Sequence, residues 1–379
     1  MRVVVNGWFW DRPETGSGQY VQRVIDALAQ ASAAKELQIL LPYDTRDCAD
    51  VLAARQNVRL VSYPIDRSHL RKLWWEQVLV PQVARRLDAD LIHVPYWAPP
   101  VVSPRPVVVT AHDIIPLVLP AYRGNARVRL YTALVSAATS RARLVLTDSE
   151  ASKADIVKHL HVPRKRVRAI PLAVGPEYVP EPMPEDPSIR KDLNLPGNYI
   201  LYLGGFDIRK NLQAVFAAFS VVHQACPDAR LVIGGRLPTN DTPFTPDPRR
   251  LAAEAGLPHN AVQFLGFVKE DEKPAVYRGA RVFMFPSIYE GFGYPPLEAI
   301  SCGVPVVGSN ASSLPEVIGS AGVLLDPQDV SGMAGAVIQL LNDHAFHDDL
   351  QQRAIRQSQC FSWTRTSADT SAAFHEALT

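Results

Sequence analysis

Two glutamates, Glu290 and Glu298, stand eight residues apart around a run of glycines, prolines and aromatic residues. Gly291 and Gly293 allow backbone amides to approach a ligand closely, and the start of the helix predicted from Leu297 favours an anion. Just inside that helix, Glu298 either balances the helix dipole or accepts hydrogen bonds from the neighbouring hydroxyls of a ribose. A phosphate at the amides, a sugar at Glu290 and a ribose at Glu298 would together describe a bound nucleotide sugar.

Two adjacent cations, Arg209 and Lys210, follow a predicted strand and a Gly-Gly turn, and they precede a predicted helix. Cations at the end of a strand can neutralise a diphosphate leaving group. The alternative is a solvated helix start, although positive charge there opposes the helix dipole. Arg209 and Lys210 are therefore candidate ligands of a diphosphate.

Two further candidate sites lie in the first half of the chain, at His112 and at Gly16-Ser17-Gly18. His112 follows the predicted strand Val107–Thr110, where its imidazole can hydrogen-bond a sugar hydroxyl or move a proton; the alternative is a buried structural histidine. Gly16-Ser17-Gly18 lead into a predicted helix, whose start also favours an anion. That stretch lacks the third glycine of the dinucleotide fingerprint, which disfavours a Rossmann dehydrogenase.

Predicted strands alternate with predicted helices, which is typical of parallel sheets with helices on both faces. In the first half we expect strands at 2–6, 37–41, 58–63, 89–94, 107–110, 143–147 and 167–171, and helices at 19–29, 71–87, 128–140 and 150–159. Six prolines in residues 175–198 indicate a linker. In the second half we expect strands at 199–203, 230–233, 262–264, 282–285, 305–308 and 323–325, and helices at 211–224, 249–255, 273–280, 297–301, 314–317, 330–342 and 363–378. The pattern predicts two doubly wound domains, which bind ligands at the carboxyl ends of their strands.

The composition fits a soluble two-domain protein, because 379 residues with 47% hydrophobic and 20% charged residues can bury a large core. No Cys-x-x-Cys pair occurs, which argues against a zinc site and suggests a reducing compartment; the cysteines are Cys48, Cys226, Cys302 and Cys360. The first apolar run is too short for a signal peptide, and no run approaches 18 apolar residues. We expect a cytoplasmic protein.

Charge is distributed unevenly along the chain. Residues 1–180 carry 24 Lys and Arg against 16 Asp and Glu, a net +8, and the rest carry 15 against 22, a net −7. A basic half suits an anionic partner such as a membrane surface, a lipid phosphate or nucleic acid, and the plain alternative is a set of solvated arginines. The basic and aromatic segment from Arg67 to Gln77 can rest on anionic lipid, although we expect Trp74 and Trp75 in the core.

Several motifs occur in one order: Gly-Ser-Gly, TAHD, LTDSEASKADI, IPLAVG, GGFDIRKNL, FLGFV, YEGFGYPPLEAISCGVPVV and a closing FSW. Their order, and the register of both glutamates with the glycines and prolines, resembles glycosyltransferase family 4. The resemblance covers nearly the whole chain. It implies an α/β fold of two tandem Rossmann-like domains that face each other across a cleft, the glycosyltransferase B-type fold.

The resemblance also implies a division of labour between the domains. Residues 1–178 would form the acceptor domain and residues 179–362 the nucleotide-sugar domain, with a last helix at about 363–379 packing on the first domain. The implied activity is transfer of a sugar from a nucleotide diphosphate sugar to a hydroxyl, with retention of anomeric configuration. No metal and no cofactor beyond the donor are implied.

Individual residues take roles by the same resemblance. Glu290 would hold the donor sugar, and His112 would touch it. Glu298 would hold the ribose, and Arg209 and Lys210 would meet the diphosphate. The remaining implied donor-binding residues are Gly16, Ser17, Gly18, Gly205, Phe267, Val268, Gly291, Phe292, Gly293 and Tyr294.

One position departs from the family pattern. Many members have an arginine where this chain has Gly205, and Arg209 would supply the charge, as in a mannosyltransferase-like subgroup. We therefore expect mannose transfer from GDP-mannose to a glycan or lipid-linked oligosaccharide of polysaccharide or O-antigen type. We also expect peripheral contact with the inner face of a membrane, and no nucleic acid partner. Three alternatives stay open: a UDP-sugar donor carrying glucose or N-acetylglucosamine, a sugar-nucleotide epimerase, and a non-catalytic binding protein of the same fold.

Overall fold

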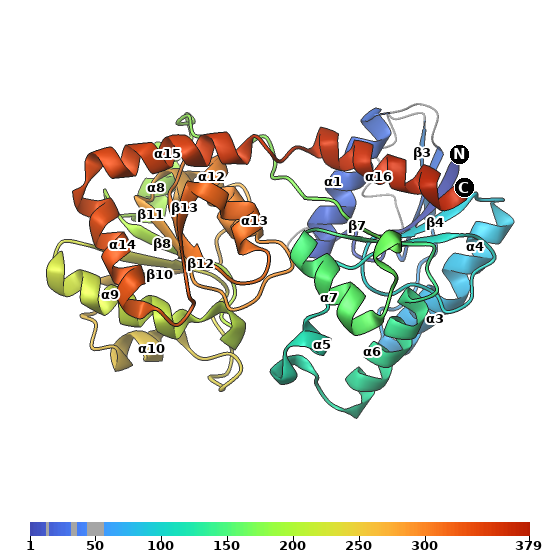
Figure 1. Cartoon of the computed structure of the whole chain (residues 1–379), viewed down its shortest axis with the longest axis horizontal. Coiled ribbons are helices and arrows are strands. Elements are labelled where there is room, and N and C mark those ends of the chain that lie inside the picture. The colour runs from blue at the N-terminus through green and yellow to red at the C-terminus, as the bar shows by residue number, and fades with distance from the viewer. Residues whose placement is uncertain (13–14, 32–35, 44–56) are drawn as a thin grey trace. The chain divides into compact units, whose positions relative to one another are not determined.

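A computed structural model describes residues 1–12, 15–31, 36–43 and 57–379, and Cys48 lies outside them. The chain divides into two compact units. The first unit comprises Met1–Leu172 and Ser362–Thr379, and the second comprises Ala173–Phe361. Each unit has a parallel sheet with helices packed around it (Figure 1). The division after Leu172 precedes the boundary expected at residue 178.

Within the described residues, the first unit contains a seven-stranded parallel sheet in the order β3-β2-β1-β4-β5-β6-β7. Its strands are β1 (Arg2–Asn6), β2 (Glu36–Leu41), β3 (Val58–Ser62), β4 (Leu91–Val94), β5 (Val107–Thr110), β6 (Leu144–Thr147) and β7 (Val167–Ala169). Strands β4, β5 and β6 are buried along their whole length because helices cover both faces of the sheet. Such strands read as continuous apolar runs, which is why the sequence predicts them well.

The helices of the first unit include the last helix of the chain. They are α1 (Gly16–Ala31), α3 (His69–Trp74), α4 (Val80–Arg86), α5 (Ile115–Val118), α6 (Ala126–Thr139), α7 (Glu150–Leu160) and α16 (Trp363–Leu378), with short turns η3 (Pro120–Tyr122) and η4 (Arg164–Arg166). Helix α16 packs against α1 and buries Phe374. The Thr366 hydroxyl donates a 2.7 Å hydrogen bond to the carbonyl of Pro171, so α16 is held where the first unit ends.

The second unit repeats the same winding order with a six-stranded parallel sheet, β10-β9-β8-β11-β12-β13. The strands are β8 (Ile200–Leu203), β9 (Leu231–Gly234), β10 (Val262–Gly266), β11 (Val282–Phe285), β12 (Val306–Ser309) and β13 (Gly322–Leu325). The helices are α8 (Asp186–Asp192), α9 (Leu212–Ala225), α10 (Pro248–Glu254), α11 (Lys273–Arg278), α12 (Tyr294–Ser301), α13 (Leu314–Ile318), α14 (Val330–Asn342) and α15 (His344–Ser358), with turns η5 (Ile208–Lys210) and η6 (Gly319–Ala321). Both sheets place the first strand of the unit beside the fourth, the switch point of doubly wound folds.

Helix α15 is not among the helices expected from the sequence. Its residues are mostly polar, and His347, Leu350 and Ala354 are its buried side chains. So narrow an apolar stripe gives a weak helical pattern in the sequence. Packing against neighbouring helices stabilises the helix instead.

The helix expected at residues 71–87 is irregular at a different place from the one predicted. The expected break was at Pro81, but a π-helical turn, η2 (Trp75–Leu79), separates α3 from α4. Pro81 lies shortly after this turn, where the backbone is still helical at Leu79 and Val80, so its missing amide hydrogen removes one hydrogen bond from a continuous helix. The structure corrects one core assignment here: Trp75 is fully buried as expected, whereas Trp74 is 41% exposed.

Among the described residues, no helix combines the length and the apolar character that crossing a bilayer requires.

Candidate functional site

The predicted cations and the first predicted carboxylate meet at one edge of the second sheet. Arg209 and Lys210 lie in η5, which follows β8, and Glu290 follows β11, the strand beside β8. Both segments therefore leave the sheet at the carboxyl ends of neighbouring strands, where doubly wound folds bind ligands. This topology brings Lys210 and Arg209 next to Glu290, although 80 and 81 residues separate them along the chain.

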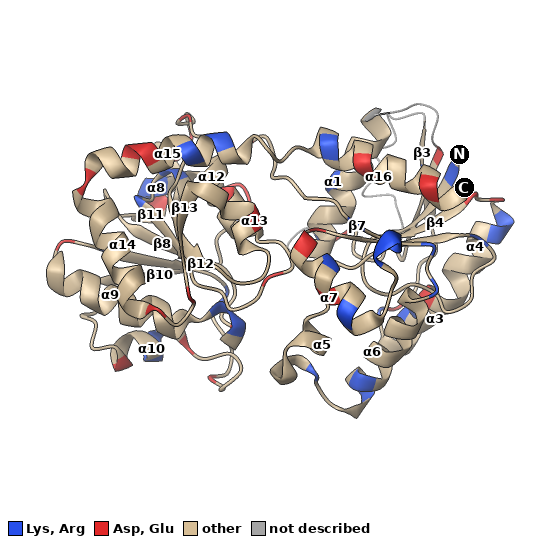
Figure 2. Cartoon of the chain, in the orientation of Figure 1, with Lys and Arg blue, Asp and Glu red and all other residues tan. Residues whose placement is uncertain are grey.

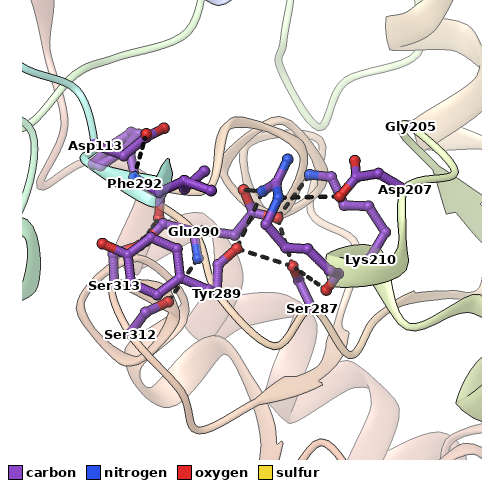
Figure 3. Close-up of polar contacts among 12 residues, drawn as sticks. Asp113, Gly205, Asp207, Lys210, Ser287, Tyr289, Glu290, Phe292, Ser312 and Ser313 are labelled. Carbon is purple, nitrogen blue, oxygen red and sulfur yellow. Dashed lines mark hydrogen bonds and ion pairs between the residues drawn. The ribbon is translucent and has the colours of Figure 1, made fainter. Parts of the chain in front are cut away.

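The Glu290 carboxylate is held by two cations and one hydroxyl (Figure 3). Lys210 Nζ lies 2.6 Å from Oε1, Arg209 Nη1 lies 2.6 Å from Oε2, and the Ser287 hydroxyl donates to Oε1 at 2.7 Å. Glu290 and Lys210 are both buried. Burial opposes ionisation of Glu290, but Lys210 and Arg209 outweigh it, and the pKa of Glu290 falls below its ordinary value. The cluster is thus an ionised carboxylate beside a guanidinium and a lysine whose pKa burial lowers.

Two serines hold the turn after Glu290 in place. The Ser313 hydroxyl donates to the carbonyls of Glu290 and Phe292, at 2.9 and 2.6 Å, and the Glu290 amide donates to the Ser312 hydroxyl at 2.8 Å. Gly293 follows with φ +121°, a conformation that favours glycine. Neither serine was among the residues expected at the site. The sequence feature that could have indicated them is their position shortly after strand β12.

The start of helix α12 corrects the predicted position of Glu298. The helix begins at Tyr294, not at Leu297, so Glu298 lies more than one turn inside it. The helix dipole acts mainly on charges in the first turn, so compensation of the dipole does not explain a carboxylate at this depth. Pro295 and Pro296 carry no amide hydrogen, so amide contacts with an anion here come from the turn at Gly291–Tyr294.

Glu298 is buried against two tyrosine hydroxyls. Tyr277 Oη donates to its Oε2 at 2.7 Å, and Tyr178 Oη donates to its Oε1 at 3.1 Å. Burial raises the pKa of Glu298, although Lys273 and the tyrosine hydrogen bonds act in the opposite direction. Each carboxylate oxygen has a second lone pair, so both can still accept a hydroxyl of a ligand. Neither tyrosine was singled out from the sequence, because both lie far from Glu298 along the chain.

In the first unit, His112 is oriented by an aspartate. Its Nδ1 lies 2.8 Å from the Asp148 carboxylate, and Tyr20 packs edge-on against the imidazole at 4.7 Å. Burial disfavours the imidazolium, but Asp148 outweighs it, and the pKa of His112 rises above its ordinary value. Nε2 is buried, and the backbone of Pro95 also favours the imidazolium. The pair is therefore an oriented imidazole that can share or release a proton. Asp148 was missed from the sequence although it follows β6 directly.

The Gly-Ser-Gly stretch opens helix α1 in the first unit. A Cβ added to Gly18 would lie 1.9 Å from the carbonyl oxygen of Arg12, so close backbone packing accounts for this glycine. An added Cβ at Gly16 would meet nothing within 4 Å. The structure thus gives Gly18 a packing role, and it does not bring this stretch together with Glu290 within one unit.

The three other candidates lie around β8 and β10 of the second unit. Gly205 is exposed after β8, and its carbonyl accepts a 2.6 Å hydrogen bond from Tyr202 Oη. Phe267 is 51% exposed, with the Arg236 guanidinium 5.1 Å from its ring centroid, while Val268 is buried. An exposed ring beside a guanidinium offers a stacking surface to a planar group.

Both halves of the chain match known family models. Residues 16–178 match the model described as Glycosyltransferase Family 4, and residues 185–357 match the model described as Glycosyl transferases group 1. O-antigen chain mannosyltransferase B of Escherichia coli is 34% identical over 265 residues, which cover 69% of this chain and 68% of that protein. The chain belongs to glycosyltransferase family 4.

Further similarities place this glycosyltransferase among enzymes of known fold. The serotype-specific mannosyltransferase WbdA of Escherichia coli is 32% identical over 270 residues, covering 69% of this chain but 32% of that longer protein. Sucrose-phosphate synthase from Thermosynechococcus elongatus superposes with a TM-score of 0.75 at 21% identity, covering 99% of this chain and 98% of the other. The Anabaena protein HepE, solved with UDP-glucose, superposes with a TM-score of 0.75 at 18% identity, covering 99% of each chain. The predicted family, the glycosyltransferase B-type fold and the assignment as a hexosyltransferase are confirmed.

Proposed function

We propose that this family 4 glycosyltransferase transfers mannose from GDP-mannose, with retention of configuration, to a hydroxyl of a glycan or lipid-linked oligosaccharide. The observation that carries the proposal is the buried cluster of Glu290, Lys210 and Arg209. It offers one acceptor for sugar hydroxyls and two cations for a diphosphate. The relatives named as O-antigen and serotype-specific mannosyltransferases support mannose as the sugar and a polysaccharide as the product.

In the proposed reaction, the bond between the sugar C1 and the diphosphate oxygen breaks while a bond from the acceptor oxygen to C1 forms. Lys210 and Arg209 stabilise the negative charge that develops on the leaving diphosphate, and removing one such group typically costs about 2.7–4 kcal/mol of transition-state stabilisation. The acceptor attacks from the face of the leaving group, and a diphosphate oxygen takes the acceptor proton. The carboxylate of Glu290 positions the sugar. No metal is required in this scheme, because side-chain cations balance the charge.

The other candidate residues take binding roles in the proposal. Glu298 accepts hydrogen bonds from the ribose hydroxyls, and the Phe267 ring with Val268 borders the base. His112, which Asp148 orients through Nδ1, hydrogen-bonds the donor sugar in this proposal. We further propose that the acceptor binds the basic first unit. Its lysines and arginines are spread over several helices (Figure 2), which suits peripheral contact with an anionic membrane surface.

Calorimetric titration without metal tests the proposal, with GDP-mannose, UDP-glucose and UDP-N-acetylglucosamine offered separately in the presence of a chelator. We expect GDP-mannose to bind, and we expect Lys210→Ala to weaken that binding by about a hundredfold, the size of one lost charge contact. Lys191→Ala is the matched control, because Lys191 is an exposed lysine of the same unit, on helix α8. Preferential binding of a UDP-sugar would overturn the donor, and unchanged binding by Lys210→Ala would overturn the diphosphate role.

An acceptor-free incubation with GDP-mannose separates a transferase from an epimerase. The proposed enzyme leaves the sugar of the donor unchanged apart from slow hydrolysis. Formation of an epimeric nucleotide sugar would overturn the proposal.

A further inference from the structure

A hollow lies in the first unit, where the chain leaves the edge strand β3 at its carboxyl end. Its volume is about 440 Å³. It is bordered by the segment after β3 and by α3 and η2, through Ser62, Tyr63, Pro64, Ile65, Asp66, Arg71, Trp74 and Leu79. None of these residues belongs to the site described above. The volume is in the range of small-molecule sites.

The aromatic wall of this hollow is Trp74, which the local fold turns outward. Helix α3 buries none of its residues, and Trp74 ends it with 41% of its surface exposed. The π-helical turn η2 begins at the next residue and directs Trp75 into the core instead. Such turns are rare and occur frequently at functional sites. The exposed part of this indole is a flat apolar surface for a ligand.

Polar groups surround the indole. Asp66 and Arg71 form an ion pair at 3.3 Å, and both are more than half exposed. The buried Ser62 hydroxyl has no hydrogen-bond partner among the residues that the structure describes. A flat apolar ring beside a carboxylate, a guanidinium and a hydroxyl matches a pyranose, which has apolar C–H faces and a rim of hydroxyls.

The place of the hollow in the sheet suggests which saccharide would occupy it. Strand β3 is four strand spacings from β5, which precedes His112, and both strands end at the same edge of the sheet. At about 4.8 Å per spacing the separation is about 19 Å, which corresponds to about four hexose units. We propose that this hollow is a distal subsite for the acceptor glycan, which holds a sugar about four units from the hydroxyl that is glycosylated. This proposal rests on the proposed glycan acceptor.

A membrane contact is the main alternative for this surface, because Leu70 on the same helix is 80% exposed. The observations favour a glycan. The surface is hollowed where Trp74 lies, and the Asp66 carboxylate and the Arg71 guanidinium offer sugar hydroxyls both an acceptor and a donor. Leu70 does not line the hollow, so it supplies a control on the same helix.

Binding of manno-oligosaccharides to the full chain, measured by calorimetry without donor, tests the subsite directly. We expect mannohexaose to bind more tightly than mannobiose, and Trp74→Ala to weaken mannohexaose binding by roughly five- to tenfold, the size of one aromatic contact. Asp66→Asn should weaken it as well, and Leu70→Ala should not. Equal weakening by Leu70→Ala, or no effect of Trp74→Ala and Asp66→Asn, would overturn the subsite.

Acceptor length provides the kinetic test. In the wild type, kcat/KM should rise once the acceptor is long enough to reach the hollow, and Trp74→Ala should remove this rise through KM while leaving kcat/KM for the shortest acceptor unchanged. Binding to vesicles that contain phosphatidylglycerol tests the lipid alternative. If Trp74→Ala and Leu70→Ala both lose vesicle binding while their glycan kinetics stay unchanged, the surface binds lipid and the subsite is overturned. If no donor supports transfer at all, the proposed function fails, whereas the calorimetric result still decides the subsite.

Discussion

Lys210 Nζ lies 2.6 Å from Glu290 Oε1, and both side chains are buried at the carboxyl edge of the second sheet. The cation proposed to meet a diphosphate is thus bonded to the carboxylate proposed to hold the sugar. Arg209 completes the cluster from the other carboxylate oxygen. Because a buried charge without its partner is costly, Glu290 and Lys210 depend on each other for their charged states.

The first prediction concerns this coupling. Lys210→Met is expected to lower the free energy of unfolding by about 1–3 kcal/mol, because Glu290 then keeps Arg209 but loses its second cation. Glu290→Gln should also destabilise, because it leaves two neighbouring cations without the carboxylate. The double variant should be more stable than the sum of the single losses predicts, by about 0.5–3 kcal/mol. Urea unfolding of the four proteins gives the coupling; strict additivity would contradict it.

The second prediction is that Glu298→Gln stabilises the fold while it weakens nucleotide binding. Burial raises the pKa of Glu298 above the ordinary value of 4.5, so the folded state holds this proton more tightly than the unfolded state. The contribution of Glu298 to stability therefore falls as pH rises from 4.5 through the raised pKa. Urea unfolding at about pH 5 and about pH 8 should show the advantage of the variant growing with pH. A wild type that is the more stable protein at the higher pH would refute this.

The third prediction makes Tyr277 and Tyr178 positioning residues for Glu298. Tyr277→Phe and Tyr178→Phe each remove one hydrogen bond to the carboxylate, and we expect each to weaken binding of the nucleoside diphosphate several-fold. The decisive readout is the ratio of affinities for the diphosphate and its 2′-deoxy analogue, which should shrink in both variants. Tyr199→Phe is the control, because its hydroxyl donates to the backbone of Val276. If all three variants leave the ratio at its wild-type value, the role is merely structural.

The fourth prediction concerns the pH dependence set by His112 and Asp148. The pKa of His112 is raised because Asp148 favours the imidazolium, so the stability gained from this pair is complete below about pH 6.5 and is lost as pH rises through the raised value. Asp148→Asn should therefore destabilise the protein more at low pH than at high pH. In the same variant, the limb of the kcat/KM profile that reports His112 should move to lower pH. An unmoved limb would mean that His112 does not control that titration.

The fold was predictable in large part because buried parallel strands have a strong pattern. Strands β5 and β11 have the predicted bounds, and so have helices α14 and α16. Helix α15 was not predicted, because its apolar stripe is too narrow to give a periodic signal. The predicted start of α12 was three residues too late. Two prolines lie in the first turn, and proline usually indicates the end of a helix, although it is also common at the start of one.

The sequence by itself determined the family, the alternation of strands and helices, and the types of charged residue at the ends of the strands. Each motif and each strand or helix pattern lies in one short stretch, and their order is read directly along the chain. Only the tertiary structure decided the partners: that Lys210 and Arg209 bond Glu290, that two distant tyrosines bond Glu298, that Asp148 orients His112, and that Trp74 faces outward. The physical reason is that these contacts join residues on different strands and helices, and pairing between them depends on which elements pack side by side.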